Sequence, residues 1–135
     1  MNDLERAAHR RVRFSRARIM SAGLLGIGVL HFLVPGPFDS IIPPMLPGRP
    51  RTYTYVSGVA EIAVAGTLAV PRTRRLGGRL AALLFVAVYP ANVQYAVDSV
   101  REPKTPALIR WASILRLPLQ LPMITQALRV SREAG

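Results

Sequence analysis

Four long apolar blocks alternate with shorter segments along the chain. The blocks lie at about residues 19–34, 53–70, 77–97 and 106–128. Acidic residues are nearly absent from them, whereas a helix on the surface of a soluble domain carries charged residues every turn. A transmembrane helix needs about 20 predominantly apolar residues. The pattern therefore predicts an all-α integral membrane four-helix bundle, with a basic cytoplasmic arm at 1–18 and a short cytoplasmic tail at 129–135.

The segment between the first two blocks, residues 35–52, contains six prolines, which exclude a long regular helix. It is nevertheless too apolar for a loop that is simply bathed in water, because it carries Phe38, Ile41, Ile42 and Met45. Two interpretations stay open. The segment is either a lid over the outer mouth of the bundle or a structured connection at the membrane interface.

Charge indicates the orientation. The formal net charge is +11, and all but one of the 18 basic residues are arginines, most of them at the ends of apolar blocks. The arm at 1–18 and the loop at 71–79 are rich in arginine, and basic residues stay on the cytoplasmic side during insertion. Both termini are therefore expected in the cytoplasm, with membrane lipids as partners. A nucleic-acid module would gather its basic residues on one solvated face, so nucleic-acid binding is not expected.

Reactive side chains are few. The chain has no cysteine, which excludes disulfides, thiol relays and thiolate metal sites. It also lacks a glycine-rich phosphate loop, a usable pair of carboxylates and a Ser-His-Asp arrangement. One histidine and one glutamate inside the blocks are too few ligands for a metal. We expect no catalytic residues and no metal site, and independent catalytic activity is the least supported hypothesis.

Polar residues inside the blocks share one depth. His31, Asn92 and Arg116 each lie thirteen residues from a basic residue at the cytoplasmic end, and Glu61 lies eleven residues from one. At 1.5 Å per helical residue these separations place all four about 16–20 Å above that end, just beyond the midplane of a core about 30 Å thick. Ionisable groups inside a span are costly and mark candidate sites. The predicted ligand-binding set is His31, Ser57, Glu61, Tyr89, Asn92, Arg116 and Gln120.

A purely structural interpretation of the same residues stays open. A buried Glu61–Arg116 ion pair would neutralise both charges and hold the helices together without any ligand. His31 is more simply explained as a hydrogen-bonded histidine than as a proton carrier. The two interpretations are compatible, because a pair that stabilises the bundle can also face a ligand.

The order of the polar motifs resembles that of the DoxX-like family of small bacterial four-helix membrane proteins. The motifs are Gly28-x-x-His31-Phe32-x-x-Pro35, Ser57-Gly58-x-x-Glu61, Tyr89-Pro90-Ala91-Asn92 and Arg116-x-Pro118-x-Gln120. They cover about residues 20–128. The resemblance implies a multi-pass protein of the bacterial inner membrane, with His31, Glu61, Asn92, Arg116 and Gln120 at the family's polar signature positions.

Some members of that family are linked to quinone-coupled sulfur oxidation or to membrane redox complexes. The leading hypothesis is therefore an intramembrane polar pocket that binds a quinone or a lipid, or that serves a membrane redox enzyme. No cofactor is certain. The alternatives are a non-catalytic assembly subunit whose polar cluster only holds the bundle, and a small transporter or pore formed by a homo-oligomer.

Overall fold

The computed structural model describes residues 1–134, and all regular structure within them is helical. The five helices are α1 (Asp3–Leu33), α2 (Pro35–Asp39), α3 (Pro50–Ala69), α4 (Arg74–Arg101) and α5 (Ala107–Glu133). The predicted all-α class is confirmed. Each of the four apolar blocks lies within a long helix, except for a single end residue in three of them.

The basic arm and the first apolar block form one helix. Asn2 caps α1 through a capping box, in which its side chain accepts from the amide of Glu5 and its own amide donates to the Glu5 carboxylate. The helix ends at Leu33, two residues before Pro35, which has no amide to donate. Pro50 similarly opens α3, where the missing amide costs nothing.

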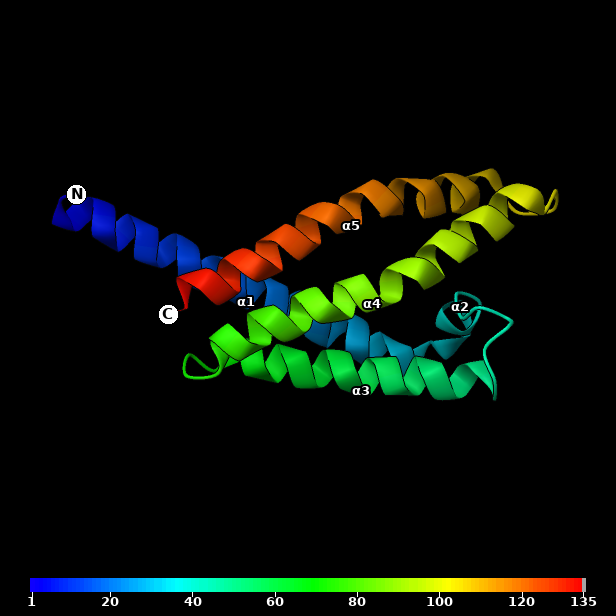
Figure 1. Ribbon diagram of the computed structural model, residues 1–135, viewed down its shortest axis with the longest axis horizontal. Coiled ribbons are helices and arrows are strands. Elements are labelled where there is room, and N and C mark those ends of the chain that lie inside the picture. Colours follow the sequence, from blue (N-terminus) through cyan, green and yellow to red (C-terminus); the bar gives the residue numbers. More distant parts are fainter. Residues whose placement is uncertain (135) are drawn as a thin grey trace.

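The long helices form two closely packed pairs, α1 with α3 and α4 with α5, and α3 packs on α4 to join them. Figure 1 shows α2 at the end of the molecule where α3 and α4 diverge, while the N-terminal part of α1 projects beyond the opposite end. Both α4 and α5 continue through their internal prolines. The axis of α5 changes direction along its length (Figure 1), as the prolines within it lead one to expect.

Glycines allow the closest helix contacts. A Cβ atom on Gly58 would lie 2.8 Å from the Cβ atom of His31, so α1 and α3 cross with their backbones nearly touching. A Cβ atom on Gly78 would lie 2.6 Å from the backbone nitrogen of Ser131, which makes the corresponding contact between α4 and α5. Gly23 and Gly26 of α1 make no such contact, because a Cβ atom there would meet nothing within 4 Å.

Apolar side chains cover much of the outer surface of the helices. Large exposed examples come from every long helix, including Ile19, Val59, Leu83 and Leu119, which are 59–72% exposed. The buried core is correspondingly built from small residues, with Leu68 and Phe85 among its few large members. Two helices, α1 and α4, are long and apolar enough to cross a membrane by length and composition.

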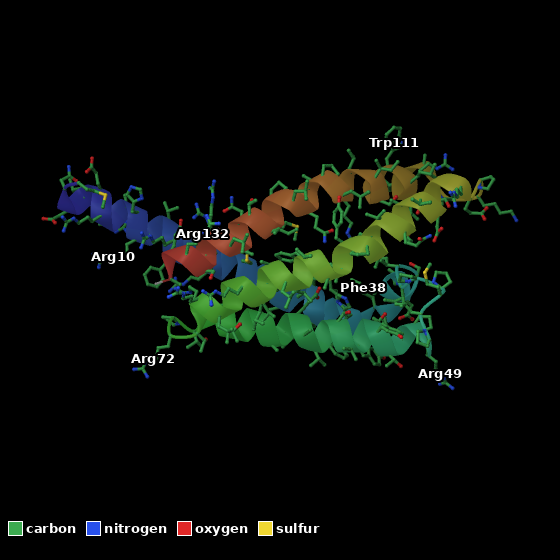
Figure 2. The ribbon with its side chains drawn as sticks, viewed as in Figure 1. Arg10, Phe38, Arg49, Arg72, Trp111 and Arg132 are labelled. Carbon is green, nitrogen blue, oxygen red and sulfur yellow. The ribbon has the colours of Figure 1, made fainter. Side chains whose placement is uncertain are left out.

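The two ends of the molecule differ in charge. Figure 2 shows Arg10, Arg72 and Arg132 at the end where the N- and C-termini lie, and Phe38 and Trp111 toward the opposite end. At the first end Arg74 is buried and donates hydrogen bonds to the carbonyl oxygens of Leu68 and Ala69. It thereby caps the C-terminus of α3, where carbonyl groups lack helical partners.

Candidate functional site

A cavity of about 90 Å³ lies between all five helices, toward the end where α2 sits. Residues from α1, α2, α3, α4 and α5 line it, together with the two isoleucines that follow α2. Eight residues singled out from the sequence are among its lining residues: His31, Phe38, Ile41, Ile42, Ser57, Glu61, Asn92 and Arg116. The structure therefore brings together one or more polar side chains from each long helix around a single cavity.

His31 is buried on α1, with its imidazole ring held between two neighbours. Its Nδ1 atom lies 2.7 Å from the carbonyl oxygen of Ile27, one turn earlier in the same helix. A carbonyl can only accept, so Nδ1 carries the proton in this bond. The ring of Phe38 stacks on the imidazole at 3.8 Å between ring centres, with an angle of 22° between the planes.

Glu61 lies beside His31 on the adjoining helix. Its Oε2 atom is 3.4 Å from His31 Nδ1, but because that nitrogen donates to Ile27, Oε2 is buried without a hydrogen bond from any residue in 1–134. An ionised carboxylate oxygen in such a position is costly unless something donates to it. The Glu61 Oε2 atom therefore lacks a hydrogen-bond donor in this site.

Arg116 faces the same cavity from α5, but the expected Glu61–Arg116 ion pair is absent from the described part of the chain. The nearest basic side chain to Glu61 is instead His31, which approaches it across the tight Gly58 crossing. Within residues 1–134 the guanidinium of Arg116 makes no hydrogen bond, and the residue is exposed. Arg116 is thus free to bind an acceptor group.

The proline-rich connection covers one side of the cavity and is anchored by a carboxylate. Asp39 accepts hydrogen bonds from the Thr54 hydroxyl at 2.6 Å and from Arg51 Nε at 2.8 Å. The Thr54 bond, together with that of Arg51, lowers the pKa of the Asp39 carboxyl from its ordinary value. These contacts hold α2 against α3, which places Phe38 over His31.

Asn92 and Gln120 form a different arrangement, deeper between α4 and α5. Asn92 Nδ2 donates to Gln120 Oε1 at 2.7 Å, and Gln120 Nε2 donates to the carbonyl oxygen of Phe85 at 2.5 Å. Gln120 does not line the cavity; Asn92 does. This chain of bonds satisfies buried polar groups within the protein and joins the two helices.

The remaining candidates fall in different places. Ser57 lines the cavity one turn before Glu61, whereas Tyr89 is half-buried on α4 and is not part of the lining. Met45 was expected in the lid together with the two isoleucines, but it is 72% exposed and lies outside the cavity. Within the connection, only α2 and the residues that directly follow it cover the site.

Sequence reasoning missed the residues that anchor the connection. Asp39 and Thr54 are fifteen positions apart, and neither stands out in an apolar pattern. The signal that was available is that Asp39 is the single acidic residue in the proline-rich segment. Ile27, Val88 and Ala91 complete the apolar wall and were not singled out either.

The described residues contain no group of three or more His, Asp or Glu side chains that could hold a metal ion. The cavity combines one carboxylate, one imidazole, one amide and one guanidinium with an apolar wall. Such a set can bind a small polar group with both donors and acceptors at the end of an apolar molecule.

Comparison with known proteins identifies the family but no activity. The chain belongs to a family described as a domain of unknown function (DUF8561), whose pattern matches residues 20–131. No curated protein and no solved structure matches the chain. The matched region includes every residue that lines the cavity and leaves the whole basic arm, residues 1–18, outside.

Proposed function

We propose that this chain is an integral membrane protein of four transmembrane helices whose central cavity binds the polar head of an amphipathic molecule, a quinone or a lipid. In this account α1, α3, α4 and α5 span the bacterial inner membrane with both termini in the cytoplasm. The bound molecule, or the protein around it, serves a membrane redox complex.

The apolar exterior supports the membrane placement. A soluble monomer rarely exposes apolar patches larger than a few hundred Å², whereas here large apolar side chains are exposed along all four long helices. The arginine-rich end would face the cytoplasm. Because the chain has no cysteine, a single cysteine at Arg49 or at Arg72 tests the orientation. A membrane-impermeant maleimide should label the first from outside intact cells and the second only after lysis; the reverse result would invert the topology.

The observation that carries the proposed function is the unsatisfied carboxylate oxygen of Glu61 in a cavity that Arg116 also faces. A ligand that fits supplies a donor to Glu61 and an acceptor to Arg116. The hydroxyl groups of a reduced quinone meet both requirements, and so does a lipid head with a hydroxyl or ammonium group. Charge-assisted bonds of this kind are stronger than neutral ones.

The size of the cavity limits what enters it. Drug-sized ligands occupy about 300–1,000 Å³, and an engineered cavity of about 150 Å³ holds one benzene. The 90 Å³ present therefore accommodates a few polar atoms but not a complete ring. Phe38 occupies the place where a ligand ring would stack on His31. Binding of a quinone ring would thus require Phe38 and α2 to move away, whereas a small lipid head would not.

The resemblance to the DoxX-like family favours a quinone as the ligand in this proposal. Quinone-coupled functions in that family agree with a pocket for an amphipathic ligand at the matching residues. The absence of cysteine means that any redox role of this chain would run through the bound molecule or a partner protein.

A structural role is the second candidate, and the Asn92–Gln120–Phe85 bonds favour it. Each member of that chain has its partner within the protein, so this part of the polar cluster needs no ligand. An assembly subunit of this kind would use the remaining polar groups to fix helix packing. It predicts that neutralising Arg116 changes the stability of the protein or of its complex and nothing else.

A titration in mild detergent distinguishes the two. The probes are a short-chain ubiquinol analogue and a dioctanoyl phospholipid, and binding is followed by native mass spectrometry. The ligand-binding function predicts that Arg116→Gln weakens one probe about tenfold, as loss of one charge-assisted bond would. The matched control Arg129→Gln lies on the same helix away from the cavity and should bind like the wild type. Equal binding by all three proteins, or none, contradicts the ligand-binding function.

A further inference from the structure

A second, larger cavity of about 210 Å³ lies at the arginine-rich end of the molecule. Its walls come from α1, from the start of α4 and the turn before it, and from the end of α5. The side chains that decide its chemistry are Arg10, Arg13, Phe14, Arg74 and Glu133. None of these residues belongs to the central cavity, so the two sites are separate.

The second cavity carries an excess of positive charge. Three arginines face one glutamate, and Oε1 of that glutamate is already paired with Arg16 at 2.7 Å. Arg74 is held in place, because Nε and Nη2 cap α3 and its guanidinium lies 5.1 Å from the centre of the Phe14 ring. Within residues 1–134 the guanidinium of Arg10 has no hydrogen-bond partner. Arginines arranged around a cavity in this way suit a phosphate group.

Glu133 makes the cavity more selective than a plain basic patch. Its Oε2 atom is buried and receives no hydrogen bond from the described residues. A phosphate diester by itself has no hydrogen to donate to this oxygen and would add a second negative charge beside it. A phosphate ester that also carries an ammonium or hydroxyl group would satisfy it.

The depth of the cavity suits a lipid. Phe14 precedes the first apolar residue of the span, Ile19, by five positions, which is about 7.5 Å along a helix. The head-group region extends about 5–8 Å beyond the hydrocarbon core on each side. Phe14 and Val130 give the cavity an apolar wall, against which the first carbons of a lipid can pack.

We propose that this second cavity binds the head group of a phospholipid of the cytoplasmic leaflet, with Arg10 and Arg13 on the phosphate and Glu133 on an ammonium or hydroxyl group of the head. The inference rests on the membrane placement proposed above and is independent of any ligand in the central cavity. Phosphatidylethanolamine and phosphatidylglycerol carry such a donor. Phosphatidylcholine does not, since its nitrogen bears three methyl groups and no hydrogen.

The test is a titration of the full chain in mild detergent with dioctanoyl forms of these three lipids, followed by native mass spectrometry. The ethanolamine and glycerol lipids should bind at least about tenfold more tightly than the choline lipid. Equal binding of all three would overturn the role of Glu133. A fourth probe, glycerophosphoethanolamine, has the same head and no acyl chains; if it binds as tightly as the lipid, the ligand is a soluble phosphate ester and the lipid assignment fails.

Variants locate the site. Arg10→Gln and Arg13→Gln should each weaken binding of the ethanolamine lipid about tenfold. Both residues are exposed, so neither substitution should affect folding. Arg11→Gln is the matched control, because it removes the same charge from the same helix but does not line the cavity. An equal loss in Arg11→Gln would show general attraction to a basic helix and overturn the proposal. Arg116→Gln leaves the second cavity unchanged and should still bind one molecule of this lipid there, whether or not the central cavity also takes up lipid, which separates the two sites.

Discussion

The imidazole of His31 lies 3.4 Å from the carboxylate of Glu61 without donating a hydrogen bond to it. The proton on Nδ1 goes to the carbonyl oxygen of Ile27 instead, at 2.7 Å. The two helices that carry this pair cross at Gly28 and Gly58, where their backbones come too close for a side chain. The pair is therefore fixed in position while one buried carboxylate oxygen has no hydrogen-bond donor among the described residues.

The first prediction concerns Glu61→Gln. The substitution keeps the size of the side chain and removes a charge that is only partly satisfied, so the melting temperature should stay the same or rise. Ligand retention should fall about tenfold, because an amide replaces a charged acceptor. Thermal unfolding and native mass spectrometry on the same preparation measure both. A clear drop in melting temperature with unchanged ligand content would show that Glu61 only holds the bundle.

The second prediction compares two glycines of α3. Gly58→Ala would place a Cβ atom 2.8 Å from side-chain atoms of His31 and Phe32, and should destabilise the protein by about 1–3 kcal/mol. Gly66→Ala is the control, since its Cβ atom meets nothing within 4 Å, and it should stabilise the helix by about 0.5–1 kcal/mol. Denaturant titration in detergent gives both values. If the two variants behave alike, α1 and α3 do not cross at this point.

The third prediction addresses the bonds between α4 and α5. Gln120→Leu leaves the amide of Asn92 and the carbonyl of Phe85 without their buried partner, at a cost of about 1–3 kcal/mol. Gln126→Leu changes the same residue type on the same helix, where no hydrogen bond is lost, and should cost less than about 0.5 kcal/mol. A double-mutant cycle with Asn92→Leu should then show a coupling energy of about 0.5–1.5 kcal/mol. Additive effects would refute the bond.

The fourth prediction is a pH dependence of the connection between α2 and α3. The pKa of Asp39 in the folded protein is lower than its ordinary value of 3.8, chiefly through the bond from Thr54. The ionised carboxylate therefore stabilises the docked connection above pH 3.8, and this stabilisation is lost as the pH falls through the folded pKa. A spin label on Met45→Cys should stay equally mobile from pH 7 to pH 5 and become more mobile below pH 3.8.

The matched control for that measurement is the same label in Asp39→Asn. This variant has no carboxylate to protonate, so its label should be mobile at every pH. A pH response that survives in Asp39→Asn would assign the effect to another group.

The helices could largely be predicted from the sequence, because each long helix carries a long, predominantly apolar block and prolines lie next to the helix ends at Pro35, Pro50 and Pro106. The polar residues could be placed at one level by counting along the helices. Which of these side chains are in contact could not be predicted, because a count of residues gives the depth of a residue but not the angle at which two helices cross. The Gly58 crossing brings His31 to Glu61, whereas one of the two interpretations of the sequence paired Glu61 with Arg116.

Contacts between side chains that are far apart in the sequence could not be predicted either. Asp39 meets Thr54 only because the proline-rich segment folds back on α3, and no local propensity specifies that path. The second cavity could not be predicted for the same reason. Its arginines were interpreted from the sequence as a topology signal, whereas their arrangement around Glu133 depends on α5 returning to the start of α1.

The central claim is that the cavity between the helices holds a molecule from the membrane. The most direct test extracts small molecules from purified protein and identifies them by mass spectrometry, for the wild type, Arg116→Gln and Arg129→Gln. Beyond any phospholipid held in the second cavity, the account predicts about one further molecule of a quinone or a lipid per chain in the wild type and in Arg129→Gln, and a loss of most of that further molecule in Arg116→Gln. The same molecules at the same ratio in all three proteins would contradict it and assign the polar cluster to packing alone.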